Sequence, residues 1–180
     1  MGSELWYAVL IAAVVVERIA ELVVSQRNVT WALGQGGAET GRGHYPLMVA
    51  LHTGLLAACL LEVFAGHRPF LPVLGATMLA LVLGAQALRW WCIGTLARRW
   101  NTRVVVIPGH PLVAAGPYRW LRHPNYLAVA IEGVALPLVH TAWVTALVFT
   151  GLNTVLLLGF RIPGEERALD TASAGRRGAG

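Results

Sequence analysis

The stretch LWYAVLIAAVVV occupies residues 5–16 and consists of twelve consecutive apolar residues. As a candidate span it continues to residue 24, and further apolar runs follow at residues 46–65, 70–93, 126–139 and 141–160. A helix needs about 20 predominantly apolar residues to cross a bilayer, and most of these runs approach that length. The sequence therefore predicts an all-α integral membrane protein with about five transmembrane helices.

The composition of the chain supports the same class. Of its 180 residues, 56% are hydrophobic and 13% are charged, whereas globular chains average about 45–50% apolar and about 25% charged residues. Cys59 and Cys92 lie in apolar runs without the spacing of a zinc site or a disulfide, so we expect no metal. The length indicates one domain, which we place at residues 1–169, followed by a disordered tail at 170–180.

The arginine residues indicate the orientation of the chain. Most of them lie in three polar segments, at residues 25–45, 97–125 and from 161 onward, whereas the two other turns hold only Arg68. Cytoplasmic loops of membrane proteins carry an excess of basic residues. We therefore expect a multi-pass protein with all three polar segments, and any polar chemistry, on the cytoplasmic side. The same rule explains the net charge of +5 without a nucleic-acid partner.

Charged residues inside the first span require an explanation, because a charge at mid-bilayer costs about 2.5–3.5 kcal/mol on insertion scales. Glu17 and Glu21 share one face of a helix, and Arg18 lies three residues before Glu21, a spacing at which side chains meet. These residues form either an internal ion pair that holds the helices together or the polar wall of a cavity. We favour the ion pair.

Three further polar residues lie inside predicted spans. His52 and Glu62 interrupt the second apolar run, and the sequence leaves a structural and a functional role equally open for both. Glu132 lies near the start of the short fourth run, from where its side chain can reach the cytoplasmic interface. We therefore interpret Glu132 as functional.

Polar and aromatic residues are densest at residues 97–126, which end in the motif RHPNY at 122–126. Aromatic residues interleaved with arginine are typical of the membrane interface, and this accounts for Trp100 and Trp120. It does not account for His123 directly before a proline where an apolar helix begins, since proline suits the first turn of a helix. A helix N-terminus also favours an anionic group, so the motif indicates a ligand site.

RHPNY, preceded by HPLV at 110–113 and GPY at 116–118 and followed by Arg161 and the glutamates at 165–166, resembles the isoprenylcysteine carboxyl methyltransferase family. The cluster at residues 17–21 and the stretch 43–52 resemble a short bacterial branch of that family. Members of the branch are thought to O-methylate alkylpyrones or alkylresorcinols. The resemblance implies an S-adenosyl-L-methionine-dependent O-methyltransferase in the bacterial cell membrane, with its cofactor site on the cytoplasmic side.

The resemblance also implies individual site residues. The residues implied to bind the cofactor are Arg103, His110, Pro111, Leu112, Val113, Tyr118, His123, Pro124, Asn125, Tyr126, Glu165 and Glu166. Arg161 is implied to face the methyl acceptor and is a candidate catalytic residue. Glu132 is a second one, as a general base or a hydrogen-bond partner of the substrate. Because Pro163 follows Arg161, we expect the helix to break between Arg161 and Glu165.

The substrate implied by the resemblance is a lipophilic small molecule or a prenylated compound that enters from the bilayer. A phenolic lipid or alkylpyrone and a prenylcysteine carboxylate remain alternatives, because both need a long apolar groove and an acidic oxygen. An NADPH-dependent membrane reductase of the sterol type is an alternative function, since such reductases carry a similar Arg-His-Pro-x-Tyr core. A non-catalytic membrane protein or transporter is the third hypothesis, although no internal repeat supports a transporter.

Overall fold

A computed structural model describes the chain at residues 2–40, 45–109 and 113–167. The elements follow in the order α1 (Gly2–Gly34), β1 (Ala38–Thr40), α2 (Tyr45–Ala65), α3 (Pro72–Leu96), β2 (Val104–Val106), α4 (Pro124–Leu138) and α5 (Trp143–Leu156). Two 3-10 turns, Ala97–Arg99 and Gly116–Arg119, lie between α3 and α4, and a π-helical turn, Leu157–Arg161, follows α5. The tail predicted at residues 170–180 lies outside the described residues.

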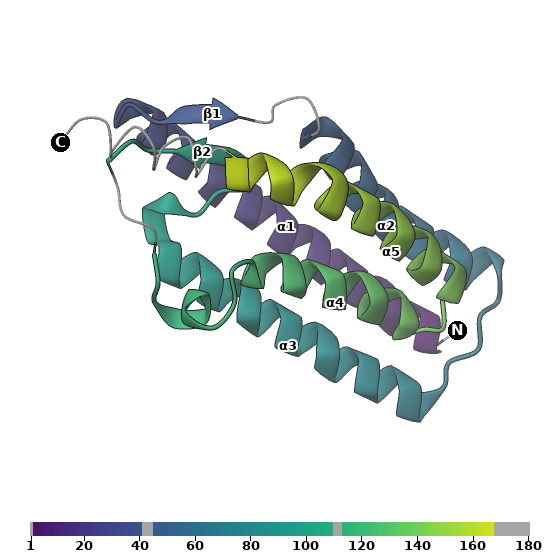
Figure 1. Ribbon diagram of the computed structural model, residues 1–180. Helices are drawn as coiled ribbons and strands as arrows, with labels where there is room; N and C mark the ends of the chain where they lie inside the picture. The colour runs from purple at the N-terminus through teal and green to yellow at the C-terminus, as the bar shows by residue number, and fades with distance from the viewer. Residues whose placement is uncertain (1, 41–44, 110–112, 168–180) are drawn as a thin grey trace.

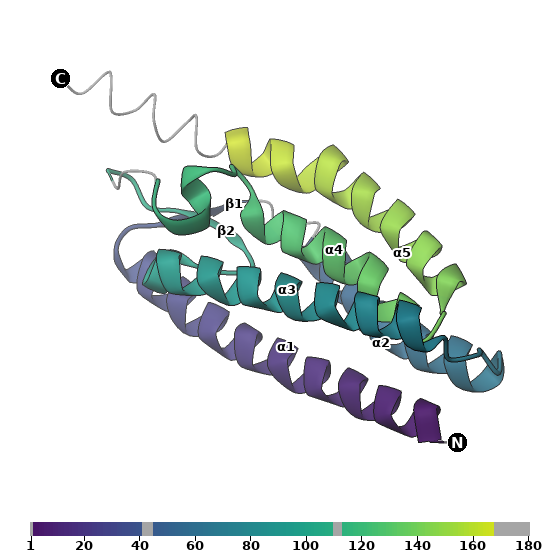
Figure 2. The same ribbon diagram turned by 90° about the horizontal axis from the view of Figure 1, so that it is seen from below.

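The five helices lie side by side and successive helices run in opposite directions, as Figures 1 and 2 show. The two strands gather at one end of the bundle with the start of α4 and the end of the α5 helix, opposite the N-terminus of α1 (Figure 1). We call this end of the bundle the polar end. It consists of the described parts of the α1–α2 connection, the α3–α4 connection and the segment after α5. The three polar segments expected on one side of the membrane therefore lie together.

The helices have the length and composition of membrane spans. Among the described residues, three segments are long and apolar enough to cross a bilayer, namely Tyr45–Ala65, Pro72–Arg99 and Trp143–Arg167. Large apolar side chains such as Leu61, Leu83 and Leu147 are exposed on the outside of the bundle, as lipid contact permits. The prediction of an all-α, multi-pass integral membrane protein is confirmed. The number of five spans stays a prediction, because α1 carries charges in its middle and α4 is only 15 residues long.

α1 is longer than predicted. We expected the first helix to end near residue 24, whereas α1 continues to Gly34, so the first part of the expected polar segment is helical. The added turns find polar contacts at the polar end: Asn28 Nδ2 donates to the carbonyl oxygen of Trp100 at 2.6 Å, and the hydroxyls of Ser25 and Thr102 are 2.9 Å apart. Most helical stability comes from such tertiary contacts, which an apolar pattern does not reveal.

The helix through α5 does not break at Pro163, and that expectation was wrong. The chain stays helical from Trp143 to Arg167, and the π-helical turn Leu157–Arg161 ends two residues before the proline. In that turn the amide of Ile162 donates to the carbonyl of Leu157, five residues back. This widened turn shifts the hydrogen-bond ladder where proline lacks an N–H and its ring would collide with the preceding turn.

A short β-ladder, which the sequence analysis did not predict, joins two connections at the polar end. β1 and β2 pair antiparallel, with Glu39 opposite Val105. The carboxylate of Glu39 and the guanidinium of Arg103, directly before β2, are 3.5 Å apart. Three-residue strands are too short to show an alternating pattern, so only their pairing identifies them.

Glu62 connects the other end of the bundle. Its carboxylate accepts hydrogen bonds from the backbone amides of Val144 at 3.2 Å and Thr145 at 2.7 Å, in the first turn of α5. It also pairs with Arg68 at 2.8 Å. The first amides of a helix have no partner within the helix, so Glu62 of α2 caps α5. Between the two roles left open for Glu62, these contacts are structural.

Candidate functional site

A cavity of about 300 Å³ lies inside the bundle, within the usual size range of small-molecule sites. All five helices and β2 contribute to its lining, and on α2 the lining residues include Tyr45, Met48 and His52. On α4 the lining residues include Asn125, Val129 and Glu132, which are likewise three or four positions apart. Residues three or four positions apart share one helical face, so the cavity runs along the bundle axis from the polar end toward the middle.

Tyr126 connects two distant segments at the polar end of the cavity. Its hydroxyl donates to the carboxylate of Glu165 and accepts a hydrogen bond from Nε of Arg161 at 3.0 Å. Arg161 is buried, and its Nη2 donates to the backbone carbonyl of Thr102 at 2.7 Å. All four residues line the cavity. The continuous helix after α5 places Arg161 and Glu165 one turn apart on the same face.

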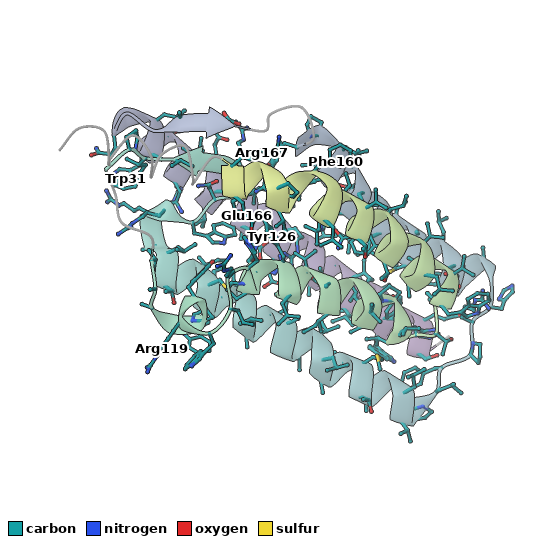
Figure 3. All side chains as sticks on the ribbon, in the orientation of Figure 1. Trp31, Arg119, Tyr126, Phe160, Glu166 and Arg167 are labelled. Atoms are coloured by element: carbon teal, nitrogen blue, oxygen red, sulfur yellow. The ribbon has the colours of Figure 1, made fainter. Side chains whose placement is uncertain are left out.

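His123 lies beside this group. Its ring stacks on that of Tyr126, with the centroids 5.4 Å apart and an interplanar angle of 21°. Its Nδ1 is 3.9 Å from Glu165 and its Nε2 is 3.6 Å from Glu166. Figure 3 shows Tyr126 and Glu166 where the start of α4 meets the C-terminal helix, the name used here for the continuous helix Trp143–Arg167. Glu165 lines the cavity, whereas Glu166 is exposed and is not part of the lining.

Several buried polar atoms at the polar end have no hydrogen-bond partner within the described part of the chain. They include Nε2 of His123, Oδ1 of Asn125 and Oδ1 of Asn101, and all three residues line the cavity. An unsatisfied buried polar atom costs about 1–3 kcal/mol. Such atoms beside a cavity are suited to bind a polar ligand.

Tyr118 lines the cavity from the turn Gly116–Arg119. Gly116 has a positive φ of 55°, and a Cβ there would meet Trp91 Nε1 at 3.1 Å and collide with Thr95, so glycine lets this turn pack against α3. Burial, with a smaller effect of Cys92, raises the pKa of the Tyr118 hydroxyl. The hydroxyl therefore stays protonated and is able to donate a hydrogen bond.

The remaining residues implied by the resemblance lie at different places. Arg103 lines the cavity, with its guanidinium 5.2 Å from the centre of the Tyr45 ring. Pro124 is buried in the first turn of α4, and Val113 is half-buried; neither is part of the lining. The residues that lie outside the described part of the chain are His110, Pro111 and Leu112.

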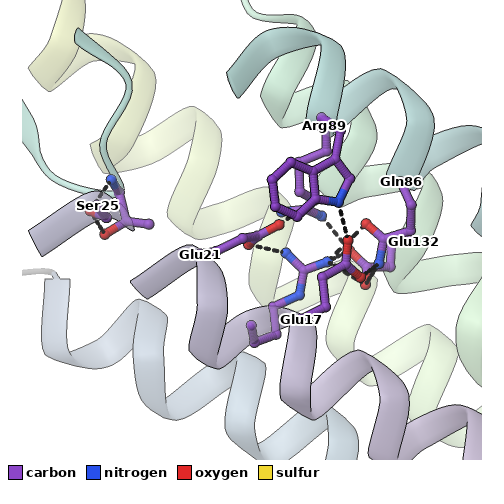
Figure 4. Close-up of polar contacts among 9 residues, drawn as sticks. Glu17, Glu21, Ser25, Gln86, Arg89 and Glu132 are labelled. Carbon is purple, nitrogen blue, oxygen red and sulfur yellow. Dashed lines mark hydrogen bonds and ion pairs between the residues drawn. The ribbon is translucent and has the colours of Figure 1, made fainter. Parts of the chain in front are cut away.

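A cluster of charged side chains, whose contacts Figure 4 shows, forms the deep wall of the cavity. Arg18 of α1 binds Glu21 at 2.5 Å and reaches Glu132 of α4 at 2.9 Å. Arg89 of α3 also binds Glu132, and its Nε is 3.5 Å from Glu21. We call these residues, together with Glu17 and Gln86, the buried charge cluster.

The buried charge cluster combines the two roles left open for the first span. Its ion pairs connect three helices, as expected of an internal pair, and Arg18, Glu21, Arg89 and Glu132 also line the cavity. Sequence reasoning assigned Arg89 no role, although a charge inside an apolar run was the signal that could have found it. Thr102 carried no comparable signal, because it takes part through its backbone carbonyl.

The model of the isoprenylcysteine carboxyl methyltransferase (ICMT) family matches residues 78–171. The chain belongs to this family. The protein is therefore a membrane methyltransferase, and the matched region contains the lining residues of α3, β2, α4 and the C-terminal helix. The contributions of α1 and α2 lie outside the match.

Relatives in two bacteria match almost the whole chain. The chain is 38% identical to the "Uncharacterized protein YpbQ" of Bacillus subtilis (strain 168) over 165 residues, which cover 91% of this chain and 96% of the relative. It is 28% identical to an "Uncharacterized protein" of Haemophilus influenzae over 160 residues, covering 88% of this chain and 91% of the relative. No solved structure matches. At this coverage, both similarities extend beyond the region matched by the family model into the N-terminal part of the chain.

Proposed function

We propose that the protein transfers a methyl group from S-adenosyl-L-methionine to an oxygen atom of a lipophilic acceptor. The observation that carries the proposal is the joining of His123, Tyr126, Arg161 and Glu165 around one end of a cavity. Glu165 and His123 suit a polar cofactor, and Arg161 suits an acidic oxygen of the acceptor. Apolar residues of the cavity lining, such as Val49, Leu56 and Leu157, suit an acyl or prenyl chain.

The polar end fits S-adenosyl-L-methionine by the chemistry of its side chains. The carboxylate of Glu165 suits the ammonium group or ribose hydroxyls. Nε2 of His123 and Oδ1 of Asn125, which accept or donate no hydrogen bond among the described residues, suit further hydrogen bonds. Tyr118 adds a protonated hydroxyl. When bound, the cofactor supplies a methyl group activated by a positively charged sulfur. The chain's own contribution is to hold two substrates in line, which is worth about 7–11 kcal/mol of a barrier.

Arg161 and Glu132 serve the acceptor in this proposal. The guanidinium of Arg161 retains N–H groups beyond those bound to Tyr126 and Thr102, and these suit a carboxylate or a phenolate. Both carboxylate oxygens of Glu132 accept hydrogen bonds from guanidinium groups, Oε1 from Arg18 and Oε2 from Arg89. It therefore acts by fixing the polar wall and bonding the substrate rather than by taking a proton.

We further propose a single methyltransferase domain at residues 1–169 in a bacterial cell membrane, with the polar end in the cytoplasm. The concentration of arginine in the segments at that end supports this orientation. Both acceptor classes, a phenolic lipid or alkylpyrone and a prenylcysteine carboxylate, are compatible with the cavity.

The test is a pair of titrations of the purified protein in detergent, followed by an activity assay. Calorimetry should detect binding of S-adenosylhomocysteine and no binding of NADPH. His123→Ala should weaken binding of S-adenosylhomocysteine by about tenfold or more, as expected for removal of a hydrogen bond to a charged or buried group. Its melting temperature should fall by no more than that of the exposed control His67→Asn. Labelled methyl should appear on an alkylresorcinol, an alkylpyrone or a prenylated cysteine. Binding of NADPH alone, or an unchanged affinity in folded His123→Ala, would contradict the proposal.

A further inference from the structure

His52 has a defined protonation pattern on the cavity wall. Its Nδ1 lies 2.8 Å from the backbone carbonyl oxygen of Met48, one turn earlier in α2. A carbonyl oxygen only accepts hydrogen bonds, so Nδ1 carries the hydrogen. In a neutral imidazole the other nitrogen, Nε2, then holds a free lone pair.

Packing fixes the orientation of this ring. Phe149 of α5 contacts it edge to face, with the centroids 5.4 Å apart and an interplanar angle of 86°. Gly133 of α4 in turn lies so close to Phe149 that a Cβ at position 133 would collide with the ring. His52, Phe149 and Gly133 all line the cavity, so three helices hold the imidazole in place there.

His52 lies on the bilayer side of the proposed cofactor site. The Tyr45 hydroxyl is 3.2 Å from that of Thr102, whose carbonyl binds Arg161, so the Tyr45 side chain reaches the level of Arg161. His52 follows seven residues later, about 10 Å along the helix axis and on the same face. Side chains of a helix tilt toward its N-terminus, which for α2 is the polar end. The ring therefore leans toward the proposed cofactor site.

The charged groups around this depth are already paired. The cavity wall there includes Arg18 and Glu21 from α1, Arg89 from α3 and Glu132 from α4, two positive and two negative charges. Glu17, bound to Gln86 behind this wall, adds one more negative charge. The deep cavity therefore has no surplus positive charge to hold an anionic acceptor. A neutral lone pair beside this wall of paired charges is free to accept a proton from a hydroxyl.

We propose that His52 accepts the proton that a hydroxyl acceptor loses during methyl transfer, an inference that rests on the proposed function. The bond between the acceptor oxygen and the methyl carbon forms as the methyl–sulfur bond breaks. The electron pair of that bond stays on sulfur, which becomes a neutral thioether. The hydroxyl proton passes to Nε2 of His52, and the ring becomes an imidazolium.

The role of His52 depends on the acidity of the acceptor. A phenolic hydroxyl has a pKa of about 10, like tyrosine, and keeps its proton at neutral pH. A carboxylate or an already ionised phenol has no proton to give up. General-base catalysis contributes about 10²–10⁴-fold to a rate, and this factor should appear with the first kind of acceptor only.

The experiment compares His52→Asn and His52→Gln with the wild type on two acceptors, an alkylresorcinol and an alkylated nitrophenol that is ionised at the assay pH. Asparagine keeps an N–H near the Met48 carbonyl, and glutamine places a polar atom near Nε2, but neither is a base. With the alkylresorcinol kcat should fall by about 100-fold or more. With the nitrophenol kcat should change by less than about threefold, because an ionised acceptor has no proton to transfer. As the pH is raised, the variants' rate with the alkylresorcinol should keep rising until the pH reaches the pKa of the acceptor. The rate of the wild type should level off at a lower pH.

Controls separate the inference from the proposed function. His67→Asn, in the exposed turn after α2, should leave both rates unchanged, and both His52 variants should bind S-adenosylhomocysteine with wild-type affinity. Equal losses with both acceptors, or no loss with either, would overturn the role of His52 while the methyltransferase activity stands. A wild type that methylates only carboxylates would overturn it as well. A wild type that neither binds S-adenosylhomocysteine nor transfers methyl would overturn the proposed function and the inference together.

A measurement on the unmodified protein completes the test. Nitrogen-15 NMR of histidine-labelled wild type distinguishes the two neutral tautomers and the imidazolium. His52→Gln identifies the His52 signals by their loss. A neutral ring with hydrogen on Nδ1 is expected at neutral pH, and hydrogen on Nε2 would contradict the proposal.

Discussion

Tyr126 donates a hydrogen bond to Glu165, 39 residues away in the chain. The same hydroxyl accepts from Arg161, so one phenol links the start of α4 to the helix that follows α5. Arg161 and Glu165 are thereby held in a fixed relation to the cavity before any ligand binds. Such preorganisation reduces the ordering cost of binding.

The two adjacent glutamates should differ in their effect on the cofactor. Glu165 lines the cavity and binds Tyr126, whereas Glu166 is exposed and is not part of the lining. Glu165→Gln should raise the apparent constant for S-adenosyl-L-methionine by roughly 10-fold, since hydrogen bonds to charged groups contribute about 1.5–3 kcal/mol. Glu166→Gln should change it by less than about threefold, as for an exposed charge. Steady-state kinetics with labelled cofactor measure both constants, and a larger effect at Glu166 would contradict this assignment.

Arg161→Lys should lower turnover more than it changes cofactor affinity. Arg161 uses separate N–H groups to bind Tyr126 at 3.0 Å and Thr102 at 2.7 Å, and a lysine ammonium lacks the planar fork that meets both and an oxyanion. We expect kcat to fall by about 10–100-fold, the cost of one or two charge-assisted hydrogen bonds. Arg167→Lys, at an exposed position two turns later, is the matched control. Wild-type turnover in Arg161→Lys would show that this guanidinium does not serve the reaction.

The buried charge cluster should contribute to stability through pairing rather than through charge alone. Arg89→Leu or Glu132→Leu leaves the other charge buried with fewer partners, which costs about 3–5 kcal/mol in buried pairs. The double variant should lose less than the sum of the two single variants, because no charge of that pair remains uncompensated. Thermal unfolding in detergent, done as a double-mutant cycle, measures the coupling. Strict additivity would mean that the Arg89–Glu132 contact is energetically unimportant.

Glu62→Ala should reduce stability without affecting the proposed cofactor site. Glu62 accepts the amides of Val144 and Thr145 at the start of α5, at the end of the bundle opposite Tyr126. Loss of a helix cap costs about 0.5–2 kcal/mol, so the melting temperature should fall while the affinity for S-adenosylhomocysteine is unchanged. Thr145→Val, which removes only the hydroxyl contact with Glu62, should show a smaller decrease. A changed affinity in Glu62→Ala would mean that the two ends of the bundle are coupled.

The sequence by itself determined the membrane class, the approximate positions of α2, α3, α4 and α5, and the placing of the polar segments at one end. Backbone groups in a bilayer must be satisfied within a helix, so a long apolar run has few other structures open to it. The motif at His123–Tyr126 was likewise readable, because proline and the polar residues before it mark the start of a helix. Because successive helices run in opposite directions and are joined by short connections, the polar segments lie at the same end of the bundle.

Only the tertiary structure decided which side chains meet. The pairs Tyr126–Glu165 and Arg89–Glu132 depend on how far each helix is rotated and how deep each residue lies, and neither quantity follows from apolar periodicity. The extension of α1 to Gly34 and the continuous helix through Pro163 have the same origin. Polar turns and a widened π-turn are weak by local propensity, so contacts with distant segments, such as Asn28 with Trp100 and Arg161 with Thr102, stabilise them.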